Sequence, residues 1–371
     1  MHGNEALDRH RGERGSRVEN AVRVGIIGTG FGAFHVEVFQ KLAGVEVAAV
    51  SSAQAARAEA VAEKFGLGIA TNDYLTVIEN VDAVVIATPP ALHARMALDA
   101  IAAGVHVFCE KPIAANVAEA RQIRDAAAAA GVTGMMNFQQ RFTPHYRRSA
   151  QLLADGAAGQ LQMADMRVPM NPVSYMRLPL WSDSKAGWFS DAAQGGGLLA
   201  SSVGPHLVDL LLWHGGPIVE VACRTIVSRP TVPLPGGGKM ANITGEDGFV
   251  LFGRYASGAL LTVRGVPVAH SAGEWTLQLD GDAGSVVVDG TRVLHYVEDA
   301  SEPTIADLPT DMPDLRVAIA STFIDAVRSG DPSPTPTLSD GVASQAVLDA
   351  ALEAARTGRW VEVANNANLA G

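Results

Sequence analysis

Short apolar runs and amphipathic stretches alternate along the first 142 residues of the chain. Val22–Ile27 is a run of mostly apolar residues rich in β-branched side chains, as is typical of a strand in the interior of a parallel sheet. Similar runs recur at a regular pitch, and stretches with helical periodicity separate them. The predicted strands are Val22–Ile27, Val45–Val50, Asp82–Ala87 and Val105–Cys109, and the predicted helices end near Leu42 or span Ala55–Phe65 and Ala91–Ala103. This alternation predicts βαβ units and a doubly wound parallel sheet.

Beyond about Arg141 the pattern changes, and most later segments are typical of strands. A predicted helix over Pro144–Asp155 leads into a strand at Leu161–Arg167, and another helix follows three glycines and ends near Gly215. The later predicted strands are Asp247–Tyr255, Ala259–Val266, Trp275–Leu279 and Trp360–Val363, the last preceded by two helices. The second half therefore predicts an α+β domain with a large, mostly antiparallel open sheet.

Composition narrows the class of protein. The chain has 371 residues, enough for two domains, and a formal net charge of −11. An acidic surface argues against nucleic acid or an anionic membrane as a partner, and no apolar run approaches the roughly 20 residues of a membrane helix. Cys109 and Cys223 are too few for a disulfide scaffold, and no Cys/His spacing predicts a metal site. The charged residues 1–20 lack the apolar core of a signal peptide, which predicts a disordered tail and a cytoplasmic location.

The first predicted strand ends in a glycine-rich loop. The loop reads Gly28-Thr29-Gly30-Phe31-Gly32-Ala33 and leads into a helix. Gly28 permits a tight turn, Gly30 lets the backbone approach a pyrophosphate, and Ala33 allows close packing of the helix on the strand. The helix that begins there offers free N–H groups to phosphates. The loop therefore predicts dinucleotide binding in a Rossmann domain; the alternative is a tight turn in a flavodoxin-like domain without a dinucleotide.

The end of the second strand indicates which dinucleotide binds. In NAD-binding domains an acidic residue usually stands about 20 residues after the glycines and binds the ribose 2′-hydroxyl. This chain has Ser51-Ser52 there, with no acidic residue until Glu59. Serine does not repel a 2′-phosphate, and Arg57 is the nearest basic candidate to bind one. The pattern favours NADP over NAD.

Several further motifs stand along the chain: Val84–His93 with its Thr88-Pro89-Pro90 turn, Gly104–Pro112 with Glu110-Lys111-Pro112, Asn137–Phe142, Gly195–Asp209 and Thr357–Val361. Together they resemble the motifs of the Gfo/Idh/MocA family of oxidoreductases, which includes glucose–fructose oxidoreductase and inositol dehydrogenase. The resemblance extends over about Val22 to Val363. It implies hydride transfer between NAD(P) and a sugar, polyol or related carbonyl compound, and a homodimer or homotetramer built on the C-terminal sheet.

Lys111 is the predicted catalytic residue, with His206 as a second, supporting one. It follows a central strand, at the edge of the sheet where doubly wound domains bind ligands. An ammonium there stabilises a developing alkoxide and transfers a proton, and Glu110 is expected to pair with it. In the family, a His such as His206 often assists the Lys, and an Asp four residues earlier often completes the set. Here that earlier residue is Ser202, which favours ketone reduction with Lys111 or a tyrosine such as Tyr175 as the acid.

The predicted sites fall in a cofactor-binding domain over 21–142 and a substrate-binding and oligomerisation domain over 143–371. The predicted cofactor-binding residues are Gly28, Thr29, Gly30, Phe31, Gly32, Ser51, Ser52, Arg57, Thr88, Pro89, Pro90, His93, Glu110, Lys111 and Gln139. The predicted substrate-binding residues are Lys111, Tyr175, Trp188, Ser202, His206 and Asp209. Two alternatives remain: redox-neutral chemistry with a tightly bound NAD, and a non-catalytic nucleotide-sensing regulator of the same fold.

Overall fold

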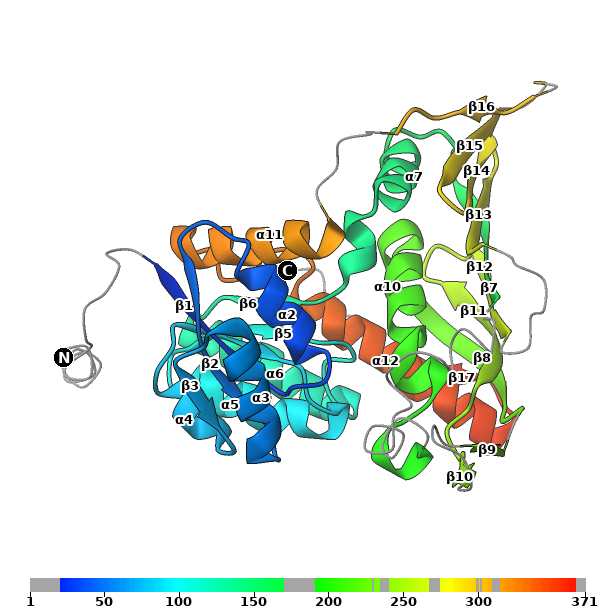
Figure 1. Ribbon diagram of the computed structural model, residues 1–371. Helices are drawn as coiled ribbons and strands as arrows, with labels where there is room; N and C mark the ends of the chain where they lie inside the picture. The colour runs from blue at the N-terminus through cyan, green and yellow to red at the C-terminus, as the bar shows by residue number, and fades with distance from the viewer. Residues whose placement is uncertain are drawn as a thin grey trace.

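The chain forms two sheets of different kind, and helices lie between them (Figure 1). The computed structural model describes residues 21–169, 191–228, 230–233, 240–266, 274–297, 300, 302–308 and 314–364. The tail predicted over 1–20 lies outside the described residues. The blue and cyan segments form one layered domain, and the strands of the second sheet lie on the far side of the green and red helices.

The first sheet is parallel throughout and has six strands in the order β3-β2-β1-β4-β5-β6. Its strands are β1 (Val22–Ile27), β2 (Val45–Ser51), β3 (Ile69–Thr71), β4 (Ala83–Ile86), β5 (His106–Cys109) and β6 (Gly134–Met136). The apolar runs of the sequence form the central strands of this sheet, and every residue of β4 is buried. The chain order reverses at β1, which pairs with β2 on one side and β4 on the other. A crevice forms at such a reversal, at the carboxyl ends of the strands.

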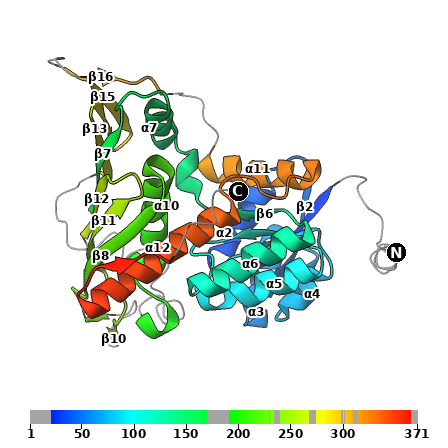
Figure 2. The same ribbon diagram turned by 180° about the vertical axis from the view of Figure 1, so that it is seen from behind.

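Helices cover both faces of this sheet. They are α2 (Gly32–Phe39), α3 (Ala55–Phe65), α4 (Tyr74–Ile78), α5 (His93–Ala102) and α6 (Val117–Ala130), joined by α11 (Leu315–Ser329) from near the end of the chain. Phe323 of α11 is fully buried, and its ring lies against those of Phe39 and Phe108. Figure 2 shows α11 lying along the Rossmann domain. Packing therefore crosses the predicted boundary at residue 142, and that boundary stays a prediction.

The second sheet has nine strands in the order β16-β15-β14-β13-β7-β12-β11-β8-β17. Its strands are β7 (Leu161–Pro169), β8 (Ile218–Ile226), β11 (Gly248–Tyr255), β12 (Leu260–Val266), β13 (Thr276–Gly281), β14 (Gly284–Asp289), β15 (Arg292–Val297), β16 (Thr304–Ile305) and β17 (Val361–Glu362). Only the β7–β12 pair is parallel among these strands. The α/β class, with a Rossmann sheet and a mostly antiparallel second sheet, is confirmed.

Three helices lie on one side of the second sheet: α7 (Pro144–Ala154), α10 (Gly204–Gly215) and α12 (Leu338–Thr357) (Figures 1 and 2). Helix α12 belongs to both domains. Its first turns pack Leu338 and Val342 into the Rossmann core, and its later turns pack Val347 and Ala351 against the second sheet. The two domains are therefore joined by a shared apolar helix. None of the helices in the described part of the chain has the length and apolar run needed to cross a bilayer.

Candidate active site

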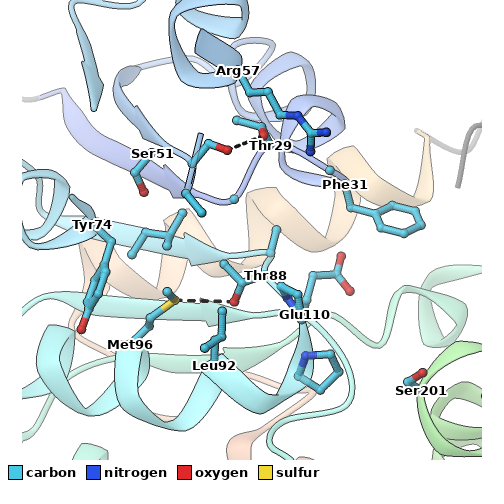
Figure 3. A pocket seen from close by; sticks show the side chains of 18 of the residues that line it. Thr29, Phe31, Ser51, Arg57, Tyr74, Thr88, Leu92, Met96, Glu110 and Ser201 are labelled. Carbon is cyan, nitrogen blue, oxygen red and sulfur yellow. Dashed lines mark hydrogen bonds between the residues drawn. The ribbon is translucent and has the colours of Figure 1, made fainter. Parts of the chain in front are cut away.

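A cavity of about 440 Å³ opens at the carboxyl ends of β1, β2, β4 and β5, where the order of the Rossmann sheet reverses. Most of the predicted site residues line it: Gly28, Thr29, Gly30, Phe31, Ser51, Ser52, Arg57, Thr88, Pro89, Pro90, Glu110, Lys111 and Ser202. Figure 3 shows Arg57 and Ser201 at opposite ends, with Thr88 and Glu110 between them. The cavity therefore joins the glycine-rich loop to the end of β5 and to the second domain.

The glycine-rich loop has the shape that a phosphate requires. Gly28 has a φ of 107°, and a Cβ there would lie 2.4 Å from the carbonyl oxygen of Ala87. A Cβ on Gly30 would meet no described atom within 4 Å, so the backbone is open to a ligand. Among the described residues, no side chain caps the start of α2. Its first N–H groups are therefore available to the phosphates of a dinucleotide.

Hydroxyl groups and one cation lie beside this loop, at the Arg57 end of the cavity. The Thr29 hydroxyl donates a 3.1 Å hydrogen bond to the Ser52 hydroxyl, and Arg57 lines the same part of the cavity (Figure 3). Glu110, which lies between the two ends of the cavity (Figure 3), is the single carboxylate among the described lining residues. No described lining residue at the Ser52 end therefore repels a 2′-phosphate.

Sequence reasoning missed part of the wall. The lining residues that it did not name include Asn72, Tyr74, Leu92, Met96 and Ser201. The Tyr74 hydroxyl donates a 2.6 Å hydrogen bond to Asp99, which fixes the ring in place. Asn72 and Tyr74 follow β3, a strand of three residues. So short a strand has no periodic pattern that would have predicted it or the residues after it.

Glu110 is held by three donors of the Rossmann domain. Its Oε1 accepts hydrogen bonds from His35 at 2.8 Å and from Asn137 at 2.7 Å, and its Oε2 accepts from the main-chain N–H of Lys111 at 3.2 Å. Burial raises the pKa of Glu110, but His35, Lys111 and Asn137 outweigh burial and lower it to about 2. The expected pairing of Glu110 with Lys111 therefore takes the form of a main-chain hydrogen bond, together with attraction between the two charges.

The Lys111 ammonium instead reaches across to the second domain. Its Nζ donates to the carbonyl oxygens of Ser201 at 3.1 Å and Ser202 at 2.9 Å, in a single π-helical turn over Leu198–Ser202. Burial lowers the pKa of Lys111, while the charge of Glu110 opposes that effect. A lysine whose pKa is lowered by burial gives up its proton more readily than a solvated one. Among the residues that the structure describes, two of its three N–H donors are used, which leaves one for a ligand.

His206 of α10 is near Lys111 but does not line the cavity. The side chain is buried, its ring meets Phe138 edge-on, and its Nδ1 has no hydrogen-bond partner among the described residues. Burial lowers the pKa of His206 to about 3, and the charge of Lys111 adds to the effect. His206 is therefore a neutral imidazole at ordinary pH.

The structure does not bring four other predicted residues to the cavity wall. Asp209 accepts two hydrogen bonds from Arg141, at 2.9 and 2.6 Å, and is fully buried. His93 is also buried, with each ring nitrogen 2.8 Å from a main-chain carbonyl oxygen. Gly32 gives close packing instead, because a Cβ there would lie 2.9 Å from Ile26. The fourth is Gln139, which has a buried Oε1 without a described partner.

Two aromatic candidates for substrate binding remain untested by this geometry. Tyr175 and Trp188 both lie outside the described residues. Ser202, which was also predicted to bind the substrate, does line the cavity.

Comparison with known proteins identifies both domains. Residues 22–138 match the GFO/IDH/MocA model described as an oxidoreductase family with an NAD-binding Rossmann fold, and residues 146–287 match the GFO/IDH/MocA C-terminal domain. An uncharacterised oxidoreductase of Synechocystis is 31% identical over 92% of this chain and 95% of its own. Levoglucosan dehydrogenase of Pseudarthrobacter phenanthrenivorans is 25% identical over 85% of this chain and 88% of its own.

A solved structure shares the fold of both domains. Levoglucosan dehydrogenase in complex with NADH and L-sorbose superposes with a TM-score of 0.82 over 92% of this chain and 99% of its own. The identity between the two is 23%, so this likeness establishes the fold alone.

The neutral state of His206 can be tested by NMR. Because its pKa in the folded protein, about 3, lies below the ordinary value of 6.5, we expect neutral imidazole shifts down to about pH 5. The unfolded chain takes up this proton first, so the contribution of His206 to stability falls as the pH drops from 6.5 towards 3. Histidine-selective ¹⁵N spectra, assigned with His206→Gln, measure the shifts. An imidazolium signal for His206 at about pH 6 would contradict this description of the site.

Proposed function

The chain belongs to the Gfo/Idh/MocA family of oxidoreductases, and we propose that it transfers a hydride between a nicotinamide dinucleotide and a secondary alcohol or ketone of a sugar-like or cyclic polyol molecule. The observation that carries the proposal is the single cavity in which the glycine-rich loop and the Lys111 ammonium meet. A relative that acts on levoglucosan, an anhydrosugar, supports the substrate class.

The dinucleotide that fits best is NADP. Gly30 and the start of α2 would hold the pyrophosphate, since the backbone there is open and uncapped. The Ser52 hydroxyl and the Arg57 guanidinium would receive the 2′-phosphate, in a part of the cavity where no described lining residue is acidic. NAD stays the alternative, because a solved relative binds NADH.

Lys111 is the group that handles the proton. A bound nicotinamide supplies or accepts the hydride. In the direction of reduction, the free N–H of Lys111 donates a hydrogen bond to the substrate carbonyl oxygen and passes its proton to that oxygen as the C–H bond forms. In the direction of oxidation the neutral amine takes the hydroxyl proton, and the lowered pKa of Lys111 makes the amine accessible. His206 acts in support, as a neutral imidazole beside Lys111.

The open face of the second sheet supports a homodimer or homotetramer. Leu251 and Leu261 are buried under the helices, whereas Phe252 and Leu260, one residue along, point to the opposite face. Phe252 is 50% exposed and Leu260 is 53% exposed. Exposed apolar side chains gathered on one face favour association with a second copy. The cytoplasmic location stays a prediction.

Cofactor choice is tested by titration of the purified protein with NADPH and NADH, followed by nicotinamide fluorescence. We expect tighter binding of NADPH, and a loss of about tenfold to a hundredfold in Ser52→Asp, because the new carboxylate repels the 2′-phosphate. Ser52→Ala removes the hydroxyl without adding charge and serves as the matched control. Equal or NADH-favoured binding in the wild type would overturn the NADP assignment. Failure of both nucleotides to bind would overturn the enzyme proposal.

Loss of the Lys111 ammonium is expected to abolish most turnover. In Lys111→Met, kcat falls by about two to four orders of magnitude while the Kd for the nucleotide changes little, because the variant lacks the proton donor and keeps the loop. Nicotinamide absorbance across a panel of polyols and cyclic sugars measures this, with the exposed Lys41→Met as control. Product formation without net absorbance change indicates redox-neutral chemistry. Binding without turnover, in wild type and variant alike, indicates a nucleotide sensor.

The oligomer is tested on the sheet face. We expect Phe252→Asp to convert an assembled wild type into monomers, because a carboxylate would be buried without a partner at the interface. Sedimentation velocity measures the change. Leu75→Asp, at a residue 41% exposed on the Rossmann domain, is the matched control and is expected to leave the assembly intact. A wild-type monomer at micromolar concentration would contradict the proposal.

A further inference from the structure

A buried carboxylate outside the cavity holds the turn to which Lys111 is bound. Glu246 lies just before β11 and is 9% exposed. Its Oε1 accepts a 2.7 Å hydrogen bond from the N–H of Ala200, and its main-chain oxygen accepts one of 2.7 Å from the N–H of Leu198. One residue therefore satisfies two N–H groups of the π-helical turn Leu198–Ser202, groups that have no partner within the turn itself.

The backbone is shaped to admit this carboxylate. Gly197 has a φ of 145°, and a Cβ there would lie 1.8 Å from Glu246 Oε2. A Cβ on Gly245 would lie 2.9 Å from the carbonyl oxygen of Gly196. Gly197 and Gly245 therefore allow residues 245–246 to lie directly against the turn. The sequence alone does not reveal this contact.

The π-helical turn presents two carbonyl groups to Lys111. The N–H of Ser202 bonds to the carbonyl of Gly197 at 3.1 Å, which closes the wide π-helical ring. In a regular helix, the carbonyl of Ser201 would accept from the residue four positions on, but that residue is Pro205, which has no N–H. The Ser201 oxygen accepts instead from Lys111 Nζ at 3.1 Å, and the Ser202 oxygen does so at 2.9 Å.

We propose that Glu246 is a positioning residue for the reaction: through the π-helical turn it fixes the two carbonyl oxygens that orient the Lys111 ammonium. The inference rests on the proposed role of Lys111 in proton transfer. Glu246 itself does not line the cavity, so its effect on turnover passes through the turn. A displacement of about 1 Å at a reacting group is enough to lower a rate about a hundredfold.

The first test measures the Lys111 amine directly and needs no substrate. Competitive labelling with acetic anhydride over a range of pH, with the Lys111 peptide quantified by mass spectrometry, reports the pKa of this amine. In Glu246→Ala the carbonyl oxygens lose their fixed position, and hydrogen bonds that favour the charged form are weakened. We expect the Lys111 pKa to fall by about one unit, a tenfold loss in proton affinity. Glu110 and His206, the other titratable groups beside Lys111, are unchanged in this variant.

Matched variants separate positioning from folding. Glu246→Gln keeps an acceptor for the Ala200 N–H and is expected to retain the wild-type Lys111 pKa. Glu246→Asp withdraws the carboxylate by one methylene and is expected to give an intermediate shift, which keeps the test valid if Glu246→Ala does not fold. Asp247→Ala removes the neighbouring carboxylate, which accepts from the N–H of Ser228 and not from the turn, and is expected to leave Lys111 unchanged.

Turnover provides the second measurement. We expect kcat to fall about tenfold to a hundredfold in Glu246→Ala, with the Kd for the nucleotide unchanged and with recovery in Glu246→Gln. A lower melting temperature with unaltered Lys111 pKa and kcat would overturn the inference and make Glu246 a structural residue. If instead Lys111→Met turns over normally, the proposed function fails, while the labelling result still reports whether Glu246 orients the amine.

Discussion

The whole site depends on one partly buried ammonium group that bridges two domains. Removing an ammonium from water is strongly unfavourable unless its N–H groups find acceptors. Lys111 leaves the end of β5 in the Rossmann domain and finds two acceptors in the second domain, the carbonyls of Ser201 and Ser202. This requirement links the glycines before the turn, the proline after it and Glu246 into one arrangement, and among the described residues it leaves one N–H of Lys111 without an acceptor.

Three buried or partly buried acids hold protein groups. Glu110 accepts from His35 and Asn137, Asp209 is bonded twice by Arg141, and Glu246 accepts from the π-helical turn. A buried carboxylate with charge-assisted or main-chain donors stays in place and does not compete for a ligand. Arg57 and Lys111 are the cations among the described lining residues, at the two ends of the cavity. This distribution of charge agrees with the proposed binding of an anionic dinucleotide at one end and a hydroxyl or carbonyl compound at the other.

Segments distant in sequence hold the two domains at the site together. Helix α12 packs its first turns into the Rossmann core and its later turns under the second sheet. Arg141 bonds to Asp209 of α10 and also lies 3.1 Å from Asp340 of α12, so three elements meet at one guanidinium. Because Arg141 and Asp209 are both buried, the loss of Arg141 would leave the Asp209 carboxyl in the core without the two hydrogen bonds that Arg141 donates. This network explains why Asp209, expected at the substrate, lies elsewhere.

Local pattern was sufficient for much of this protein. Periodicity predicted the central parallel strands, and it predicted both ends of the helix Ala55–Phe65 correctly. The Gly28–Gly30 loop and Lys111 could be placed at the cavity because tight turns and the ends of strands depend on neighbouring residues. Contacts between residues far apart in the chain were decided by the tertiary structure alone. The partners of Lys111 lie 90 and 91 residues away, Arg141 takes Asp209 from 68 residues away, and Ala200 binds Glu246 across 46. No local signal encodes such distances, because they arise only when separately specified elements pack and each buried polar group must find a partner.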